Sequence, residues 1–141
     1  PESHTSLNKH EIQYLTGGWF EEWCYYQIKS KFELTDEQMG LGLIVNAIAN
    51  NDLDVVFLLN NNLFVVECKT LLGRDLQQST IYKSGALIEK FGKAAQAVLL
   101  TLQDLREKNG DLKASIDLRA RQQNVIIKDR KDIINFDQIK F

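Results

Sequence analysis

Cysteine is scarce in this sequence, and the two that occur, Cys24 and Cys68, stand far apart. Neither belongs to a CxxC motif or to a cluster of cysteine and histidine residues. A disulfide framework and a zinc knuckle are therefore excluded as the features that organise the fold. We predict that both residues are reduced, buried thiols.

Long hydrophobic runs are also absent. The longest apolar stretches, residues 55–59 and 94–100, are far shorter than the roughly 20 residues that a helix needs to span a bilayer. The N-terminus lacks a signal-peptide pattern, so we expect a soluble, cytoplasmic protein with no membrane segment. With 141 residues, 44% of them hydrophobic and 26% charged, the chain is expected to form one globular unit with a full core.

The chain has no large excess of charge of one sign, since its formal net charge is −2. Any binding of nucleic acid must then depend on a local basic patch, a bound metal or a partner domain. The sequence begins at Pro1, without methionine, and its first ten residues are polar. We therefore expect residues 1–16 to be an N-terminal tail or linker remnant, and residues 17–141 to be a domain cut from a longer chain.

The apolar patterns along the chain predict an α/β fold in which a central mixed β-sheet is flanked by helices. An amphipathic helix is followed by three strands, and then helices alternate with strands. The helices are expected at residues 17–31, 82–93 and 112–123, the strands at 41–49, 53–59, 63–66, 96–101 and 124–128, a loop after Lys69 as far as Ser79, and a final helix or tail at 131–141.

A β-hairpin is predicted where Asn60, Asn61 and Asn62 separate two apolar runs, because asparagine tolerates the left-handed conformation of tight turns. If the turn is centred between Asn60 and Asn61, residues whose numbers sum to 121 lie opposite each other. Asp54 then faces Glu67. Directly opposed side chains lie close together, so two carboxylates at this position destabilise the sheet unless a proton or a cation intervenes.

The paired acids are typical of a divalent-metal site, and oxygen ligands of this kind favour Mg²⁺ or Mn²⁺. Side chains alternate along a strand, so Lys69 is expected on the same face as Glu67, while Cys68 points to the other face. Beside a metal-bound phosphate, the lysine could orient or deprotonate the attacking water, or stabilise negative charge. The pattern favours hydrolysis of phosphodiester bonds.

A simpler interpretation is a solvated sheet end that carries a structural ion pair. A [DE]-x-K tripeptide is common by chance, and it also occurs at Asp111 with Lys113 and at Asp129 with Lys131. Only the tripeptide at Glu67 follows an apolar strand and has an acidic residue at the start of the partner strand.

These residues resemble the core of the restriction-endonuclease-like, PD-(D/E)xK nuclease superfamily. The resemblance rests on residues 51–57 (NDLDVVF), 64–70 (FVVECKT) and 17–23 (GGWFEEW). Together with residues 82–87 (YKSGAL), it is closest to the C-terminal nuclease domain of CRISPR-associated effectors. In those effectors an N-terminal CARF domain binds cyclic oligoadenylate and switches on the nuclease. This sequence has Leu53 where the superfamily motif has proline.

The resemblance implies a role for each matching residue. Asp54 and Glu67 would be metal ligands, with the backbone carbonyl of Cys68 completing the set. Lys69 would be the catalytic lysine. Glu21 would be the carboxylate of the first helix that supports the metal or a second ion.

Two assignments stay open, because Glu22 is the alternative to Glu21 and Asp52 is a rival ligand on the same strand as Asp54. Tyr82 and Lys83 would contact substrate phosphate. The helix face that carries Lys83 is also compatible with ordinary exposure to solvent.

The function implied is a metal-dependent endonuclease acting on DNA, RNA or both, as the effector domain of an antiviral CRISPR nuclease that cyclic oligoadenylate activates. Such a protein is expected to be a homodimer with a CARF sensor domain outside this sequence. The first alternative is a restriction or repair-type DNA endonuclease. The second is a catalytically inactive domain for dimerisation or nucleic-acid binding.

Overall fold

The computed structural model describes residues 6–45 and 51–141, without the side chains of residues 51 and 74–78. Its sheet has five strands in the order β1-β2-β3-β4-β5. The first three strands are antiparallel and the last three are parallel, so the predicted mixed sheet is confirmed. The strands are β1 (Met39–Val45), β2 (Asn51–Leu59), β3 (Asn62–Lys69), β4 (Ala95–Thr101) and β5 (Val125–Lys128). The predicted strand residues 46–49 lie outside the described residues.

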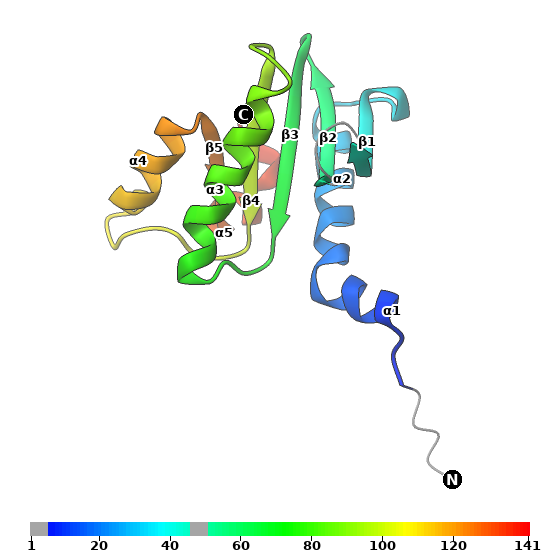
Figure 1. Ribbon diagram of the computed structural model, residues 1–141, viewed down its shortest axis with the longest axis horizontal. Helices are drawn as coiled ribbons and strands as arrows, with labels where there is room; N and C mark the ends of the chain where they lie inside the picture. The colour runs from blue at the N-terminus through cyan, green and yellow to red at the C-terminus, as the bar shows by residue number, and fades with distance from the viewer. Residues whose placement is uncertain (1–5, 46–50) are drawn as a thin grey trace.

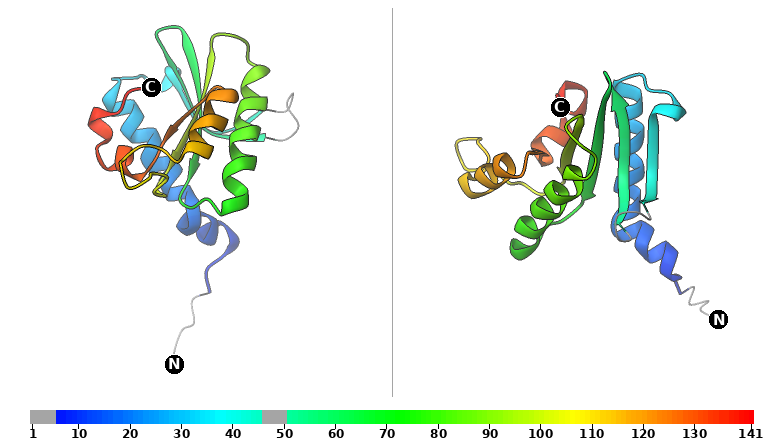
Figure 2. Two further views of the ribbon diagram at one scale, coloured as in Figure 1. Left: turned by 90° about the vertical axis from the view of Figure 1, so that its left-hand side faces the viewer. Right: turned by 45° about the horizontal axis from the view of Figure 1, so that its top comes forward.

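Helices cover both faces of this sheet (Figures 1 and 2). One face packs on α2 (Trp19–Lys31) and on the C-terminal segment, which consists of α5 (Arg130–Ile134) and a 3-10 turn (Phe136–Gln138). The other face packs on α3 (Arg74–Glu89) and α4 (Ala114–Gln122). The sheet therefore separates two hydrophobic clusters. Within the described residues, no helix is both long and apolar enough to cross a membrane.

The hairpin between β2 and β3 has the predicted register. Its paired residues run from Val55 opposite Val66 to Leu59 opposite Asn62, and each pair of numbers sums to 121. Asn60 and Asn61 form the turn with φ angles of 52° and 62°. Two successive positive φ angles match the twist of the flanking strands, which is why asparagine at these positions specifies the register.

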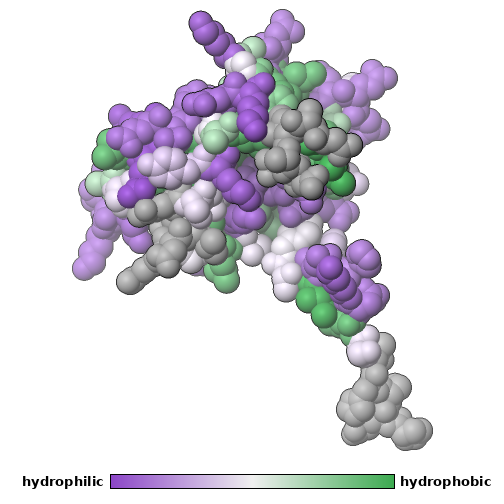
Figure 3. Space-filling model, in the orientation of Figure 1, coloured by the Kyte–Doolittle hydropathy of each residue, from purple (hydrophilic) through white to green (hydrophobic). Residues whose placement is uncertain are grey.

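The N-terminal helix is longer than expected. Helix α1 (Lys9–Gln13) begins with a capping box between Asn8 and Glu11, although residues 1–16 are predicted to be a tail. It continues through a π-helical segment (Tyr14–Gly18) into α2, and this end projects from the body (Figure 1). In Figure 3 the projection carries exposed hydrophobic atoms. The predicted boundary at residue 17 thus lies inside one helical run.

Helix α3 also differs from its prediction, because it begins at Arg74 rather than at Tyr82 and ends at Glu89 rather than at Lys93. The predicted loop after Lys69 is therefore wrong from Arg74 onward. In the sequence, the first turns of α3 consist mostly of polar residues. A search for apolar periodicity finds little signal in such a segment.

Asp129 is fully buried and joins β5 to α5. Its carboxylate accepts hydrogen bonds from Arg106 Nε at 3.0 Å and from the backbone nitrogens of Leu105 and Lys131. Arg106 also donates to Asp132 at 2.8 Å. In the tripeptide formed by Asp129 and Lys131, the acidic residue therefore has a structural role.

We expect Asp129→Ala to lower the free energy of unfolding by about 2 kcal/mol or more, because it leaves Arg106 without its buried partner. Urea denaturation followed by circular dichroism measures the loss. Asp137→Ala, at an exposed position, is the matched control and should change stability little. Equal stability of the two variants would contradict a structural role for the network.

Candidate active site

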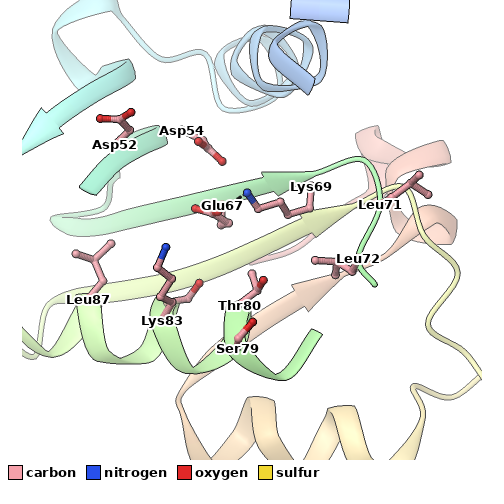
Figure 4. Close-up of a pocket in the computed structure, with 11 residues that line it drawn as sticks. Asp52, Asp54, Glu67, Lys69, Leu71, Leu72, Ser79, Thr80, Lys83 and Leu87 are labelled. Carbon is pink, nitrogen blue, oxygen red and sulfur yellow. Dashed lines mark ion pairs between the residues drawn. The ribbon is translucent and has the colours of Figure 1, made fainter. Parts of the chain in front are cut away.

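A pocket of about 530 Å³ lies between the sheet and α3. Strands β2 and β3 supply acidic side chains to one wall, and α3 supplies the facing wall (Figure 4). The charged residues that line it are Asp52, Asp54, Glu67, Lys69 and Lys83. Among the residues whose side chains the structure describes, the pocket therefore brings together three carboxylates and two ammonium groups from separate elements.

Asp54 and Glu67 lie one position beyond the last described pair of the β2–β3 ladder, Val55 with Val66. Both line the pocket, as the register predicts. The Asp54 carboxylate accepts a hydrogen bond from the backbone nitrogen of Cys68 at 2.8 Å. This contact fixes one oxygen of Asp54 against β3 and leaves the carboxylate beside Glu67.

The pKa of Asp54 is raised from its ordinary value of 3.8 to about 7. Burial is the main cause, and the neighbouring charge of Glu67 adds to it, while the hydrogen bond from Cys68 acts in the opposite direction. The ionised form is thus costly in this environment. A bound cation would remove that cost, so the local electrostatics fit a metal site.

Lys69 forms an ion pair with Glu67, with 2.9 Å between Nζ and Oε1. The two residues are next-but-one neighbours on β3, and their side chains share a face of the strand. Burial lowers the pKa of Lys69, but attraction to Glu67 outweighs it and the pKa is raised overall. The side chain is therefore an ammonium ion at neutral pH.

Cys68, between these two residues, points to the other side of the sheet. It packs in the hydrophobic cluster beneath α2 and contacts Cys24. The hydrogen bond with Cys24, together with burial, raises the pKa of the Cys68 thiol well above its ordinary value. Both cysteines are free and buried, so the predicted reduced thiols are confirmed.

Glu21, in the first turn of α2, belongs to the electrostatic environment of the pocket. Burial raises its pKa, Lys69 lowers it, and the charges of Glu67 and Asp52 raise it further. The π-helical segment that precedes α2 is close to the end of β3, because the Thr70 hydroxyl donates to the carbonyl of Thr16 at 3.4 Å. Between Glu21 and Glu22, these charge interactions favour Glu21 as the first-helix carboxylate.

The α3 wall contributes groups that sequence reasoning missed. Ser79, Thr80 and Ser84 line the pocket with Lys83. They lie at helical spacing on one face of α3. The helix was predicted to begin at Tyr82, which excluded Ser79 and Thr80. The face that they share with Ser84 was therefore not recognised. Tyr82 is half exposed and does not belong to the described lining, because its position on the helix falls outside the arc that contains these residues.

A metal at this site would need ligands besides carboxylates. Among the residues that the structure describes, no three Asp, Glu, His or Cys side chains form a cluster that could hold an ion. Mg²⁺ and related ions are often bound by one or two carboxylates, with water and substrate phosphate filling the remaining positions. Asp54 and Glu67 fit that pattern.

The sequence matches the model of a known protein family. A sequence model described as "Card1-like, endonuclease domain" matches residues 8–138. No curated protein matches the sequence.

Three solved structures show the same fold. Protein VC1899 from Vibrio cholerae is 22% identical, with a TM-score of 0.72 over 93% of this chain and 34% of its own. Can2 from Sulfobacillus thermosulfidooxidans, solved in complex with cyclic tetra-adenylate, is 23% identical, with a TM-score of 0.69 over 92% of this chain and 37% of its own. The small subunit of the heterodimeric restriction endonuclease R.BspD6I is 13% identical, with a TM-score of 0.57 over 85% of this chain and 67% of its own. The chain thus spans about a third of the length of the first two.

Proposed function

Because the chain belongs to the Card1-like endonuclease domain family, we propose that its pocket hydrolyses phosphodiester bonds of DNA, RNA or both with the help of Mg²⁺ or Mn²⁺. The observation that carries this proposal is the meeting of Asp54, Glu67 and Lys69 in one pocket. The two carboxylates, with the backbone carbonyl of Cys68, would hold the ion. When bound, such an ion supplies Lewis acidity and lowers the pKa of its water.

Lys69 would act on the phosphate as a cation. Its ammonium group is held 2.9 Å from Glu67, and its raised pKa keeps it protonated. A fixed positive charge beside the reacting phosphate stabilises the negative charge that develops in the transition state. This role fits the ammonium better than removal of a proton from water does.

The charges of the pocket are consistent with a phosphodiester substrate. With all their carboxylates ionised, the described residues that line the pocket carry three negative and two positive side chains. One divalent cation changes the net charge of −1 to +1, and a phosphodiester group brings it to zero. The acidic pocket would therefore attract a nucleic-acid backbone only after it has bound metal.

Lys83 is the residue most suited to hold a neighbouring phosphate. It extends from α3 toward the sheet (Figure 4) and lines the same pocket as Lys69. We expect Lys83→Ala to raise the KM for a nucleic-acid substrate about tenfold and to change kcat little, because a single phosphate contact is lost. Steady-state cleavage of a labelled oligonucleotide measures both constants.

Lys93→Ala is the matched control for that variant. Lys93 is also exposed and follows the same helix, but the hollows that it lines contain none of the acidic residues of the pocket. Its replacement should leave both constants unchanged. An equal rise in KM for the two variants would indicate general charge attraction instead of a defined contact at Lys83.

We further propose that the domain is the effector part of a longer, homodimeric protein that cyclic oligoadenylate controls through a CARF domain. The support is the cyclic tetra-adenylate bound to Can2 and the threefold greater length of the two more similar structures. A restriction-type nuclease is the alternative, and its support is the likeness to the R.BspD6I subunit.

The test is a cleavage assay with labelled single-stranded and double-stranded DNA and RNA, in Mn²⁺ or in EDTA. Metal-dependent cleavage of any substrate is expected, and the full-length protein should respond to cyclic oligoadenylate. Cleavage of duplex DNA alone, with no response in the full-length protein, would favour the restriction-type alternative. Absence of cleavage under all conditions would favour an inactive binding domain.

A further inference from the structure

Strand β1 contains a residue whose backbone is not that of a strand. Gly42 lies in its middle and has a φ of +61°. In the ladder with β2, Leu41 pairs with Val55 and Leu43 pairs with Leu53. Gly42 therefore lies opposite Asp54, which is the most perturbed carboxylate of the pocket. A left-handed glycine in a strand is typical of a local bend.

The alternation of side chains is interrupted on β1 at this point. A Cβ atom added to Gly40 would lie 2.5 Å from Cδ1 of Leu43, so the Leu43 side chain covers Gly40. Residues three apart in a regular strand point to opposite faces. Leu43 can cover Gly40 only because the chain turns over between them, and Gly42 is the residue in that interval with a positive φ.

The same interruption occurs on β2. Leu53 packs in the hydrophobic cluster on the α3 side of the sheet, whereas Val55 packs in the cluster on the α2 side. Two residues of one strand that are two apart would share a face if the strand were regular. Asp54 lies between them, so both strands depart from regular geometry at the same level of the ladder.

Asp54 lies at the level of this irregularity. Its carboxylate reaches β3 and accepts the hydrogen bond from the Cys68 backbone nitrogen at 2.8 Å. The described backbone pairing of β2 with β3 begins at the next residue, Val55. The Asp54 carboxylate thus accepts from the backbone N–H of Cys68, which lies just beyond the described paired residues of β3.

We propose that Gly42 is a positioning residue that holds the Asp54 carboxylate against the Cys68 amide and in the pocket. Its left-handed backbone bends β1, and β2 follows because the two strands are paired on both sides of the bend. The geometric part of this proposal stands on the structure alone. Its consequence for metal binding and cleavage rests on the proposed function.

Substitution at Gly42 can test the backbone effect without steric interference. An added Cβ would meet no atom within 4 Å, so only the φ angle opposes a side chain there. Valine disfavours a positive φ strongly, alanine less strongly, and asparagine tolerates it. Gly42→Val should straighten the bend, and Gly42→Asn should preserve it.

Gly92 offers a matched control. It has a φ of +89°, and an added Cβ would also meet nothing within 4 Å, but it lies between α3 and β4 and does not line the pocket of Asp54 and Glu67. Gly92→Val introduces a comparable backbone strain. Any effect that is specific to Gly42 must therefore be absent from this variant.

The first measurement is amide hydrogen exchange at Cys68 in the metal-free protein, relative to Val66 on the same strand. We expect Gly42→Val to reduce the protection of Cys68 about tenfold, with Gly42→Asn and Gly92→Val close to wild type. The second is Mn²⁺ binding by calorimetry, in which Gly42→Val should weaken affinity about tenfold, as is usual when the orientation of a ligand is lost.

Equal behaviour of Gly42→Val and Gly92→Val in both measurements would overturn the proposal. If Gly42→Val does not fold, Gly42→Ala replaces it, and the same comparison is made with Gly92→Ala. Failure of the wild-type protein to bind Mn²⁺ would instead count against the proposed function. In that case the exchange of the Cys68 amide still decides whether Gly42 positions Asp54.

Discussion

Replacing Asp54, Glu67 or Lys69 by alanine is expected to abolish Mn²⁺-dependent cleavage, with a loss of at least about a hundredfold in kcat/KM for each variant. The carboxylate variants should also lose Mn²⁺ binding. Lys69→Ala should retain binding and lose mainly kcat, because the ammonium group acts on the reacting phosphate. Cleavage kinetics and calorimetry separate these two kinds of loss.

The chain provides its own controls for this experiment. Asp111 and Lys113 form a chance [DE]-x-K tripeptide outside the pocket, and Asp111 is exposed. The variant proteins Asp111→Ala and Lys113→Ala should cleave the substrate at the wild-type rate. Unchanged cleavage in all three pocket variants, with the fold intact by circular dichroism, would remove Asp54, Glu67 and Lys69 from the active site.

The second large effect is a dependence of stability on pH that Asp54 controls. Its pKa is about 7 in the folded protein and close to 3.8 when the chain is unfolded. The folded state therefore holds the proton more tightly. The stabilisation from the protonated form is complete below pH 4 and is lost as the pH rises through about 7. We expect the melting temperature of the metal-free protein to fall by roughly 5 °C between pH 5 and pH 8.

Asp54→Asn should remove most of this fall and make the metal-free protein more stable than wild type at pH 8. Asp111→Asn, which changes an exposed carboxylate, should leave the pH dependence unchanged. Thermal denaturation in EDTA at a series of pH values measures the difference. Parallel curves for wild type and Asp54→Asn would contradict the raised pKa.

The affinity for metal should rise with pH as Asp54 loses its proton, whereas the stability of the metal-free protein falls. A divalent cation binds the carboxylate form, so protons compete with it below pH 7. With the pKa of Asp54 at about 7, the affinity for Mn²⁺ should be about tenfold weaker at pH 6 than at pH 8. The thermal stabilisation by Mn²⁺ should accordingly be larger at pH 8, where the repulsion between Asp54 and Glu67 is strongest.

The nuclease family could be identified from the sequence because its motif is local. The resemblance to PD-(D/E)xK nucleases is confirmed by the family match over residues 8–138. The hairpin was predictable because a two-residue turn needs positive φ angles at adjacent positions, which Asn60 and Asn61 tolerate, and such a turn allows one register. That register brings Asp54 and Glu67 to the same end of the ladder.

Other features depend on contacts between segments that are distant in the sequence. The proximity of Glu21 to the charges of the pocket depends on how α2 packs on the sheet. The pocket wall that faces the acidic strands depends on α3, whose start could not be found from apolar periodicity because its first turns are polar. The pKa of Asp54 depends on burial, which no single segment determines.

The sequence by itself determined the pairing of the two strands around the triple asparagine and the spacing of Glu67 and Lys69. Only the tertiary structure decided that Lys83 faces the acids, that Asp54 accepts the Cys68 amide, and that Gly42 lies opposite Asp54. The physical reason is range. Turn chemistry and alternation act over a few residues, whereas burial, charge coupling and strand bending arise only when separate elements pack together.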